Sequence, residues 1–142
     1  MRVQVSASVV LDQPRPVVRR YLISRWVDPD KEGKVVGRVF AGADEGPTAT
    51  TGRARDVLPA FEVATSREEE RSSPTSRQAF EVEVYGVLWR YELEARGPQQ
   101  TGLHMVYVQA GFMARVPGMR MLMTRAMERE TNRLRRWAAD TA

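Results

Sequence analysis

The stretch MRMLMTRAMERETNRLRRWAA, residues 119–139, decides the fold of this chain, because the residues before it are predicted to form a surface on which it packs. On a helical wheel of about 100° per residue, its apolar residues fall on one broad face, as a helix packed on a core requires. That face comprises Met119, Leu122, Met123, Ala126, Met127, Leu134, Trp137 and Ala138. Glu130 lies near the middle of this apolar stripe. The pattern predicts a long amphipathic helix with one carboxylate on its packing face.

The residues before this helix mostly alternate between apolar and polar side chains, which predicts half-buried strands. Strands are predicted over residues 2–11, 34–41, 48–58, 61–67, 77–85, 87–95 and 101–112. A short helix is predicted over residues 14–25, with Asp12 as its N-cap and with Pro14 and Pro16 in its first turn. Residues 42–47 and 68–74 read as a loop and a solvated hairpin end. This order predicts an α+β fold in which an antiparallel sheet of about six or seven strands wraps around the last helix.

Length and composition limit what the chain can be. Its 142 residues predict a single domain over 1–142, and the absence of cysteine excludes disulfides and thiol catalysis. The sequence has no apolar run near 18 residues and no signal pattern, so no transmembrane segment is expected. We therefore expect a soluble, cytoplasmic protein. The net charge of +4 comes almost wholly from arginine. Nucleic-acid binding is not expected, because no aromatic-interleaved motif accompanies that charge.

Three stretches together resemble a known superfamily. They are the opening strand with its proline-bearing helix (Val3 to Leu22), the segment YELEARGPQQTG at 91–102, and the end LRRWAA of the last helix at 134–139. The chain resembles the START-like, polyketide cyclase/dehydrase (SRPBCC) superfamily over nearly its whole length. The resemblance implies the helix-grip fold, in which a bent sheet holds the last helix over a cavity. It also implies a hydrophobic ligand such as a polyketide, lipid or quinone, but no catalytic residue, because the superfamily shares no universal catalytic set.

The residues exclude several chemistries directly. One histidine and no cysteine leave no transition-metal site, and no acidic cluster has the spacing of a calcium loop. No glycine-rich phosphate loop is present, so no cofactor is expected. A Ser-His-Asp triad would need His104, and no serine has the context of a nucleophile elbow. General acid–base work in an apolar pocket remains.

Three residues are candidates for that acid–base role. Glu130 interrupts the apolar helix face, although a salt bridge to an inward-pointing arginine would explain it equally. His104 is predicted to face inward because it has the same parity as Val106 and Val108, or else it is a partly buried histidine bonded to a neighbour. Tyr91 is predicted on an inward strand face, where its hydroxyl can orient a carbonyl or serve only in packing.

Ligand contacts are expected from apolar and aromatic side chains around the cavity. The predicted set is Trp89, Tyr91, Phe112, Met119, Met123 and Met127. Methionine suits a surface that adapts to varied ligands, but it also fills gaps in cores. Arg53 and Arg55 lie on one side of their predicted strand and Asp56 on the other, and the sequence does not decide which side faces inward.

The sequence therefore leaves three functions open. The first is an enzyme that cyclises, aromatises or dehydrates a polyketide-like substrate by positioning it for acid–base catalysis. The second is a carrier or sequestering protein for a lipid or quinone without turnover. The third is a basic module that uses the arginines of residues 119–139 for nucleic acid or the ribosome. The chain is expected to be a monomer or a homodimer, and its sequence does not name the ligand.

Overall fold

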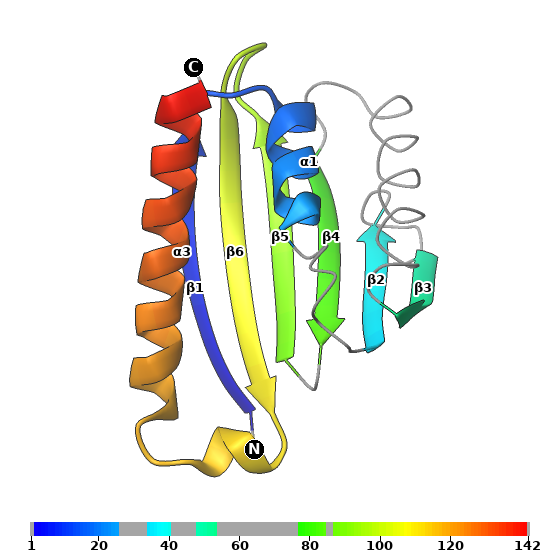
Figure 1. Ribbon diagram of the computed structural model, residues 1–142, viewed down its shortest axis with the longest axis vertical. Helices are drawn as coiled ribbons and strands as arrows, with labels where there is room; N and C mark the ends of the chain where they lie inside the picture. Colours follow the sequence, from blue (N-terminus) through cyan, green and yellow to red (C-terminus); the bar gives the residue numbers. More distant parts are fainter. Residues whose placement is uncertain (1, 26–33, 41–47, 54–76, 85–86, 142) are drawn as a thin grey trace.

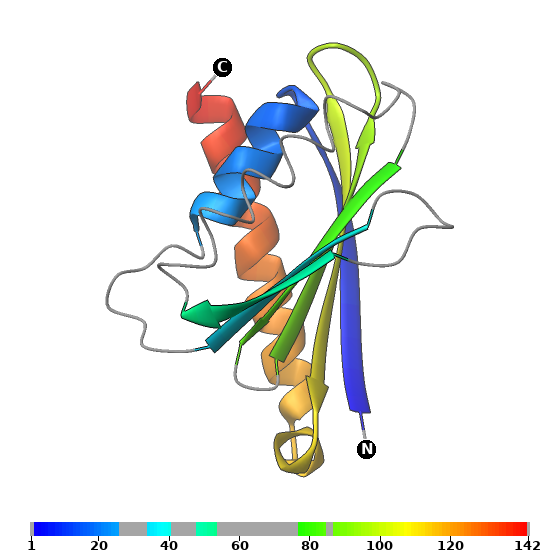
Figure 2. The same ribbon diagram turned by 90° about the vertical axis from the view of Figure 1, so that its right-hand side faces the viewer.

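An antiparallel sheet carries both helices on the same side (Figures 1 and 2). The computed structural model describes residues 2–25, 34–40, 48–53, 77–84 and 87–141. Along the chain the elements are β1 (Arg2–Leu11), α1 (Arg15–Ser24), β2 (Lys34–Phe40), β3 (Thr48–Arg53), β4 (Arg77–Val84), β5 (Val87–Ala95), β6 (Thr101–Ala110), the 3₁₀ helix η1 (Phe112–Arg115) and α3 (Met119–Thr141). The predicted α+β class, antiparallel sheet and C-terminal helix are confirmed.

Some predicted features lie outside the described residues. They are the loop at 42–47, the end of the strand predicted at 48–58, the strand at 61–67 and the hairpin end at 68–74. Arg55 and Asp56 also lie outside them, and only the backbone of Arg53 is described. The side of this strand that faces inward, which the sequence does not decide, therefore also lies outside what the structure describes.

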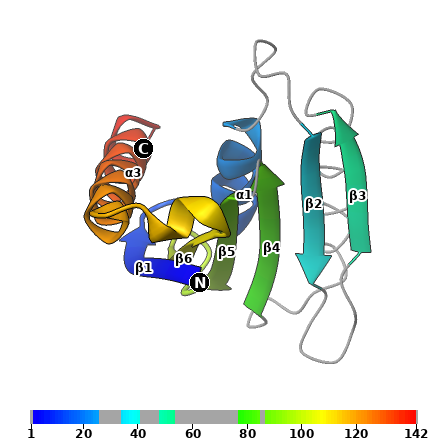
Figure 3. The same cartoon turned by 90° about the horizontal axis from the view of Figure 1, so that it is seen from below.

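The strand order brings the two ends of the chain together. The order across the sheet is β1-β6-β5-β4-β2-β3, and each pair of neighbours is antiparallel. β1 pairs with β6 over its whole length, from Arg2 opposite Ala110 to Leu11 opposite Thr101. Because β1 forms the edge of the sheet, the chain that leaves β6 can return along that edge. α3 does so and packs mainly on β1 (Figure 3).

The inner face of the sheet, defined here as the face that carries α1 and α3, is apolar. Because side chains alternate across a strand, every second residue of the paired strands lies on it. Its fully or nearly buried members are Val9, Leu11, Phe80, Val82, Tyr91, Leu93, Leu103 and Met105. Burial of each such side chain stabilises the fold by about 1.5–3 kcal/mol, which makes this face the core.

α1 closes one end of the inner face. It begins after Pro14, whose carbonyl accepts hydrogen bonds from the amides of Val17 and Val18 at 3.0 and 3.1 Å. The prediction that Asp12 caps this helix is wrong, because its carboxylate instead accepts a hydrogen bond from the Gln100 side chain at 3.1 Å. On the packing side, Val18, Leu22 and Ile23 are buried in the core.

α3 buries a narrower stripe than its sequence predicts. The buried residues are Met123, Met127, Glu130, Leu134 and Ala138. Leu122 was expected on this face and is 53% exposed, because α3 packs mainly on a single strand, which covers only a narrow part of the helix. The far end of α3 is held by Gln13, whose side-chain amide donates to the carbonyl of Ala138 at 3.2 Å.

β6 ends two residues before the predicted limit of 112. Gly111 has a φ of 76°, a left-handed value that strands do not use and that glycine adopts without strain. The chain turns there into η1, which begins at Phe112. Phe112 is therefore outside the sheet, and its predicted place on the last strand is wrong.

Candidate functional site

A charged pair lies within the apolar inner face. Glu130, on the packing side of α3, places Oε1 against Nη1 of Arg25, the residue that ends α1. The two side chains are 10% and 22% exposed. The carboxylate that interrupts the apolar stripe is thus paired with an inward-pointing arginine, which was one of the two sequence interpretations.

Tyr91 lies close to this pair. Burial lowers the pKa of Arg25 below its ordinary value, and the positive charge of Arg133 lowers it further. The nearby Tyr91 and Tyr21 act in the opposite direction and raise this pKa. Tyr91 reaches this point from β5 and is 2% exposed. Two of the three predicted acid–base residues, Glu130 and Tyr91, therefore meet at Arg25. No pattern in the sequence singles out Arg25 itself, since it stands at a helix end far along the chain from Glu130.

Aromatic rings continue the inner face away from the ion pair. Trp89 and Tyr107 stack with their ring centroids 4.3 Å apart, and Tyr91 stands 6.2 Å from Trp89. Trp89 and Tyr107 are only half-buried, unlike Tyr91. Burial raises the pKa of Tyr107 above its ordinary value. Tyr107 was not predicted from the sequence, because the alternate residues of β6, those of the same parity as His104 and Val106, were predicted to face inward.

The predicted methionine contacts divide between two clusters. Met127 belongs to the main core, while Met123 packs with Val3 and Ala114 in a smaller cluster, where half-buried Met119 joins it. Tyr107 packs against both clusters and so connects them. Phe112, also predicted as a ligand contact, is 83% exposed in η1 and stands apart from them.

The prediction that His104 faces inward is wrong. Its neighbours Leu103 and Met105 fill the inner face, so His104 lies on the outer face of the sheet. There its Nδ1 lies 2.8 Å from Oγ of Ser8, and Glu92 stands opposite it on β5. These three residues also line an open depression of about 750 Å³. His104 is thus separated by the sheet from Glu130, and it joins no common site with it.

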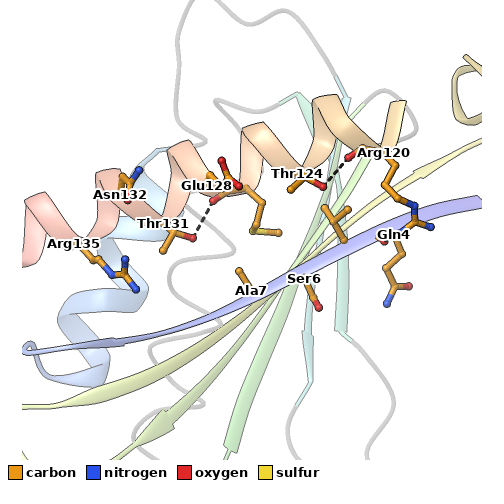
Figure 4. Close-up of a pocket in the computed structure, with 11 residues that line it drawn as sticks. Gln4, Ser6, Ala7, Arg120, Thr124, Glu128, Thr131, Asn132 and Arg135 are labelled. Atoms are coloured by element: carbon orange, nitrogen blue, oxygen red, sulfur yellow. Dashed lines mark hydrogen bonds between the residues drawn. The ribbon is translucent and has the colours of Figure 1, made fainter. Parts of the chain in front are cut away.

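A groove runs between the edge strand β1 and α3 (Figure 4). It has a volume of about 650 Å³ and is mostly polar. Its lining residues are Gln4, Val5, Ser6, Ala7, Arg120, Thr124, Met127, Glu128, Thr131, Asn132 and Arg135. Arg120 spans it by donating to the carbonyl of Gln4 at 3.3 Å. Met127 is the one predicted ligand contact that lines it, so this groove is not the apolar cavity that the sequence predicts.

One polar side chain of the inner face lacks a partner. Gln78 on β4 has the same parity as Phe80 and Val82 and is 5% exposed, yet neither its amide nitrogen nor its oxygen is hydrogen-bonded. An unpaired buried amide destabilises a fold by about 1–3 kcal/mol. Within the described ranges, no group of His, Asp or Glu side chains is arranged to hold a metal ion.

Comparison with known proteins gives no match: no family model, curated protein or solved structure is similar to the chain. None of the helices in the part that the structure describes has the length and apolar character needed to cross a membrane.

Proposed function

We propose that this protein binds a hydrophobic small molecule, of polyketide, lipid or quinone type, against the inner face of its sheet. The observation that carries the proposal is the stacked pair Trp89 and Tyr107, two large rings that share this apolar face and remain half-buried. Ligand sites are mostly apolar and aromatic with a few polar groups that fix orientation. Met123 and Met127 supply an adaptable wall beside the rings.

The polar groups of the same face suit a ligand with an oxygen-bearing end. Arg25 can donate to a carbonyl or a carboxylate, Tyr91 can donate or accept, and the Gln78 amide has both a free donor and a free acceptor. A carbonyl or hydroxyl group at any of these positions would be hydrogen-bonded in surroundings that exclude water. These groups favour a polyketide or quinone over a plain hydrocarbon chain.

The architecture that goes with this proposal is the helix-grip, with the sheet bent around α3 and the ligand between them. Its support is the order of elements, the two helices on one side of the sheet and the resemblance to the START-like superfamily. In this proposal α3 is one wall of the binding site, and Glu130 is its polar feature.

A catalytic form of the proposal uses the same residues. Arg25 favours the ionised carboxylate of Glu130, so Glu130 would act as a base and take a proton from a carbon next to a ligand carbonyl. The electron pair of the broken C–H bond moves to the carbonyl oxygen, to which the Tyr91 hydroxyl would donate a hydrogen bond. Such an enolate is the species that ring closure of a polyketide needs. In the carrier form, Glu130 only fixes the helix.

Binding is tested by titration with anilinonaphthalene sulfonate, whose fluorescence rises in apolar sites. We expect saturable binding and displacement by at least one of three competitors: oleate, a naphthoquinone and a polyphenolic anthraquinone. Trp89→Ala should weaken binding by roughly two- to tenfold, since a ring contact contributes about 0.5–1.5 kcal/mol, and Trp89→Phe should weaken it less. Val10→Ala, on the exposed outer face, is the matched control. Binding that is unsaturable and unaffected by Trp89→Ala would contradict the proposal.

The enzyme and the carrier are separated by Glu130→Gln. The protein is incubated with a poly-β-keto thioester, and mass spectrometry monitors the loss of water that accompanies cyclisation and aromatisation. The enzyme predicts turnover that Glu130→Gln abolishes while ligand affinity changes little. Turnover that is equal in both proteins would refute the role of Glu130, and no turnover with intact binding would favour the carrier.

A further inference from the structure

An apolar surface is exposed at one end of the molecule. Phe112 and Met113 of η1 are 83% and 50% exposed, and Met121 and Leu122 in the first turn of α3 are 56% and 53% exposed. We call these four residues the η1–α3 tip. Among the described residues, the large hydrophobics that are exposed are these four and Val10 on the sheet. Clustered apolar exposure of this kind marks an interaction site more often than single exposed residues do.

The η1–α3 tip occupies an extremity of the molecule. η1 follows the end of β6, where Ala110 lies opposite Arg2 at the start of β1. Figures 1 and 2 both place η1 at the lowest point of the molecule, below the strand ends, with the start of α3 next to it along the chain. A projecting end of this kind can meet a flat surface without obstruction from the sheet or from α1.

The stretch of chain that carries the tip has charges of one sign. Arg115, Arg120 and Arg125 are exposed within or beside it, and the chain has no aspartate or glutamate between Glu94 and Glu128. Arg2 is also exposed at this end. Exposed apolar side chains beside arginines, in a stretch of chain without acidic residues, complement a surface that is apolar inside and negatively charged at its boundary.

We propose that the η1–α3 tip docks on an anionic membrane surface. Phe112, Met113 and Leu122 would enter the boundary between headgroups and acyl chains, to a depth of about 5–10 Å, while Arg115 and Arg125 contact lipid phosphates. This is attachment to the membrane face, consistent with helices that cannot cross a membrane in the described ranges. A protein partner would also cover apolar residues, but exposed arginines in a stretch without acidic residues, from 95 to 127, favour the lipid surface. The proposal does not depend on the inner-face ligand.

Vesicle flotation tests the docking. The probe vesicles are phosphatidylcholine alone and phosphatidylcholine mixed with phosphatidylglycerol. We expect binding to the mixed vesicles only, decreasing as salt is raised because exposed charges are screened. Arg115→Gln with Arg125→Gln should weaken binding by roughly fivefold for each arginine, and Phe112→Ser with Leu122→Ser by at least about tenfold. Val10→Ser and Arg136→Gln, exposed residues away from the tip, should leave binding unchanged.

Site-specific fluorescence shows which residues enter the lipid. Because the chain lacks cysteine, Met113→Cys and Val10→Cys each accept a single environment-sensitive dye. Mixed vesicles should shift the emission of the dye at residue 113 to the blue and leave the dye at residue 10 unchanged. All seven substituted residues are exposed, so far-ultraviolet circular dichroism should be unaltered.

Three results would overturn the proposal. They are no binding to the mixed vesicles at low salt, equal binding by the Phe112→Ser, Leu122→Ser variant, and a blue shift at residue 10 but not at residue 113. Self-association that this variant abolishes, without vesicle binding, would make the tip a protein interface and would equally refute membrane docking.

Discussion

Replacing Arg25 while Glu130 remains tests whether the ion pair is buried as the structure describes. In Arg25→Met the carboxylate keeps its place on α3, where its side chain is only 10% exposed, without a compensating charge. Removing one partner of a buried pair costs about 3–5 kcal/mol. Because the site of Arg25 itself is 22% exposed, water can reach the carboxylate in part, and we expect the lower end, about 3 kcal/mol. Glu130→Leu should cost less, about 1–2 kcal/mol, since the arginine can turn toward solvent.

The double variant distinguishes pairing from general damage. When both charges are replaced by apolar side chains, no buried charge is left uncompensated, so Arg25→Met with Glu130→Leu should lie within about 2 kcal/mol of the natural protein. The coupling energy between the two sites should therefore be at least about 2–3 kcal/mol. Urea unfolding of the four proteins, followed by circular dichroism, measures it.

The control uses two exposed charges of the same helix, Glu128 and Arg136. Glu128→Leu and Arg136→Met should add within about 0.5 kcal/mol, as distant surface sites do. A coupling energy between Arg25 and Glu130 as small as this control would refute the buried ion pair. Such a result would also remove the electrostatic basis of the proposed role for Glu130, because that role depends on Arg25 favouring its ionised carboxylate.

Three further predictions follow from single side chains. Gly111→Ala should lower the free energy of unfolding by about 1–3 kcal/mol in urea titrations, because a φ of 76° strains any side chain; no change would mean that the turn relaxes. In an ultraviolet pH titration, Tyr107→Phe should remove one phenolate transition whose pKa lies above the ordinary tyrosine value of 10.0, since burial raises the pKa of Tyr107. The raised pKa means that the folded protein keeps the Tyr107 proton more firmly than the unfolded chain does. The stability that depends on neutral Tyr107 is therefore complete below pH 10.0 and is lost as the pH rises through the folded pKa. Over that pH range Tyr107→Phe should lose less stability than the natural protein. His104→Ala should not change the affinity for anilinonaphthalene sulfonate, since His104 lies on the outer face; weaker binding would refute the assignment of the ligand to the inner face.

The elements were predictable where one periodicity dominates. The alternation of β5 is unambiguous, and its predicted limits of 87–95 agree with the structure. α3 begins at the predicted residue and ends two residues after the predicted limit of 139. The error at His104 has a physical origin, because β6 is apolar in both parities: Val106 and Val108 compete with Leu103 and Met105. Only pairing with β5, whose faces are clear, decides which set points inward.

The site was less predictable than the fold, because its parts come from distant positions. Glu130 could be recognised as an exception within its own helix, which is local information. Its partner could not, since Arg25 is one of many arginines and reaches Glu130 only because α1 and α3 lie on the same side of the sheet. Tyr91 joins them through the strand order. Local patterns therefore predict candidate residues, while topology decides which of them meet.

The ion pair also bears on why such a site exists. A buried pair is seldom more stabilising than well-packed apolar residues of similar size, so stability alone does not account for charges at Arg25 and Glu130. If the apolar double variant unfolds at the same urea concentration but no longer binds a ligand carrying a carbonyl, the charges serve binding rather than folding. If it folds and binds as before, the pair only sets how α1 packs against α3. The unpaired amide of Gln78 on the same face favours the first outcome, because a fold selected for stability alone would have no use for it.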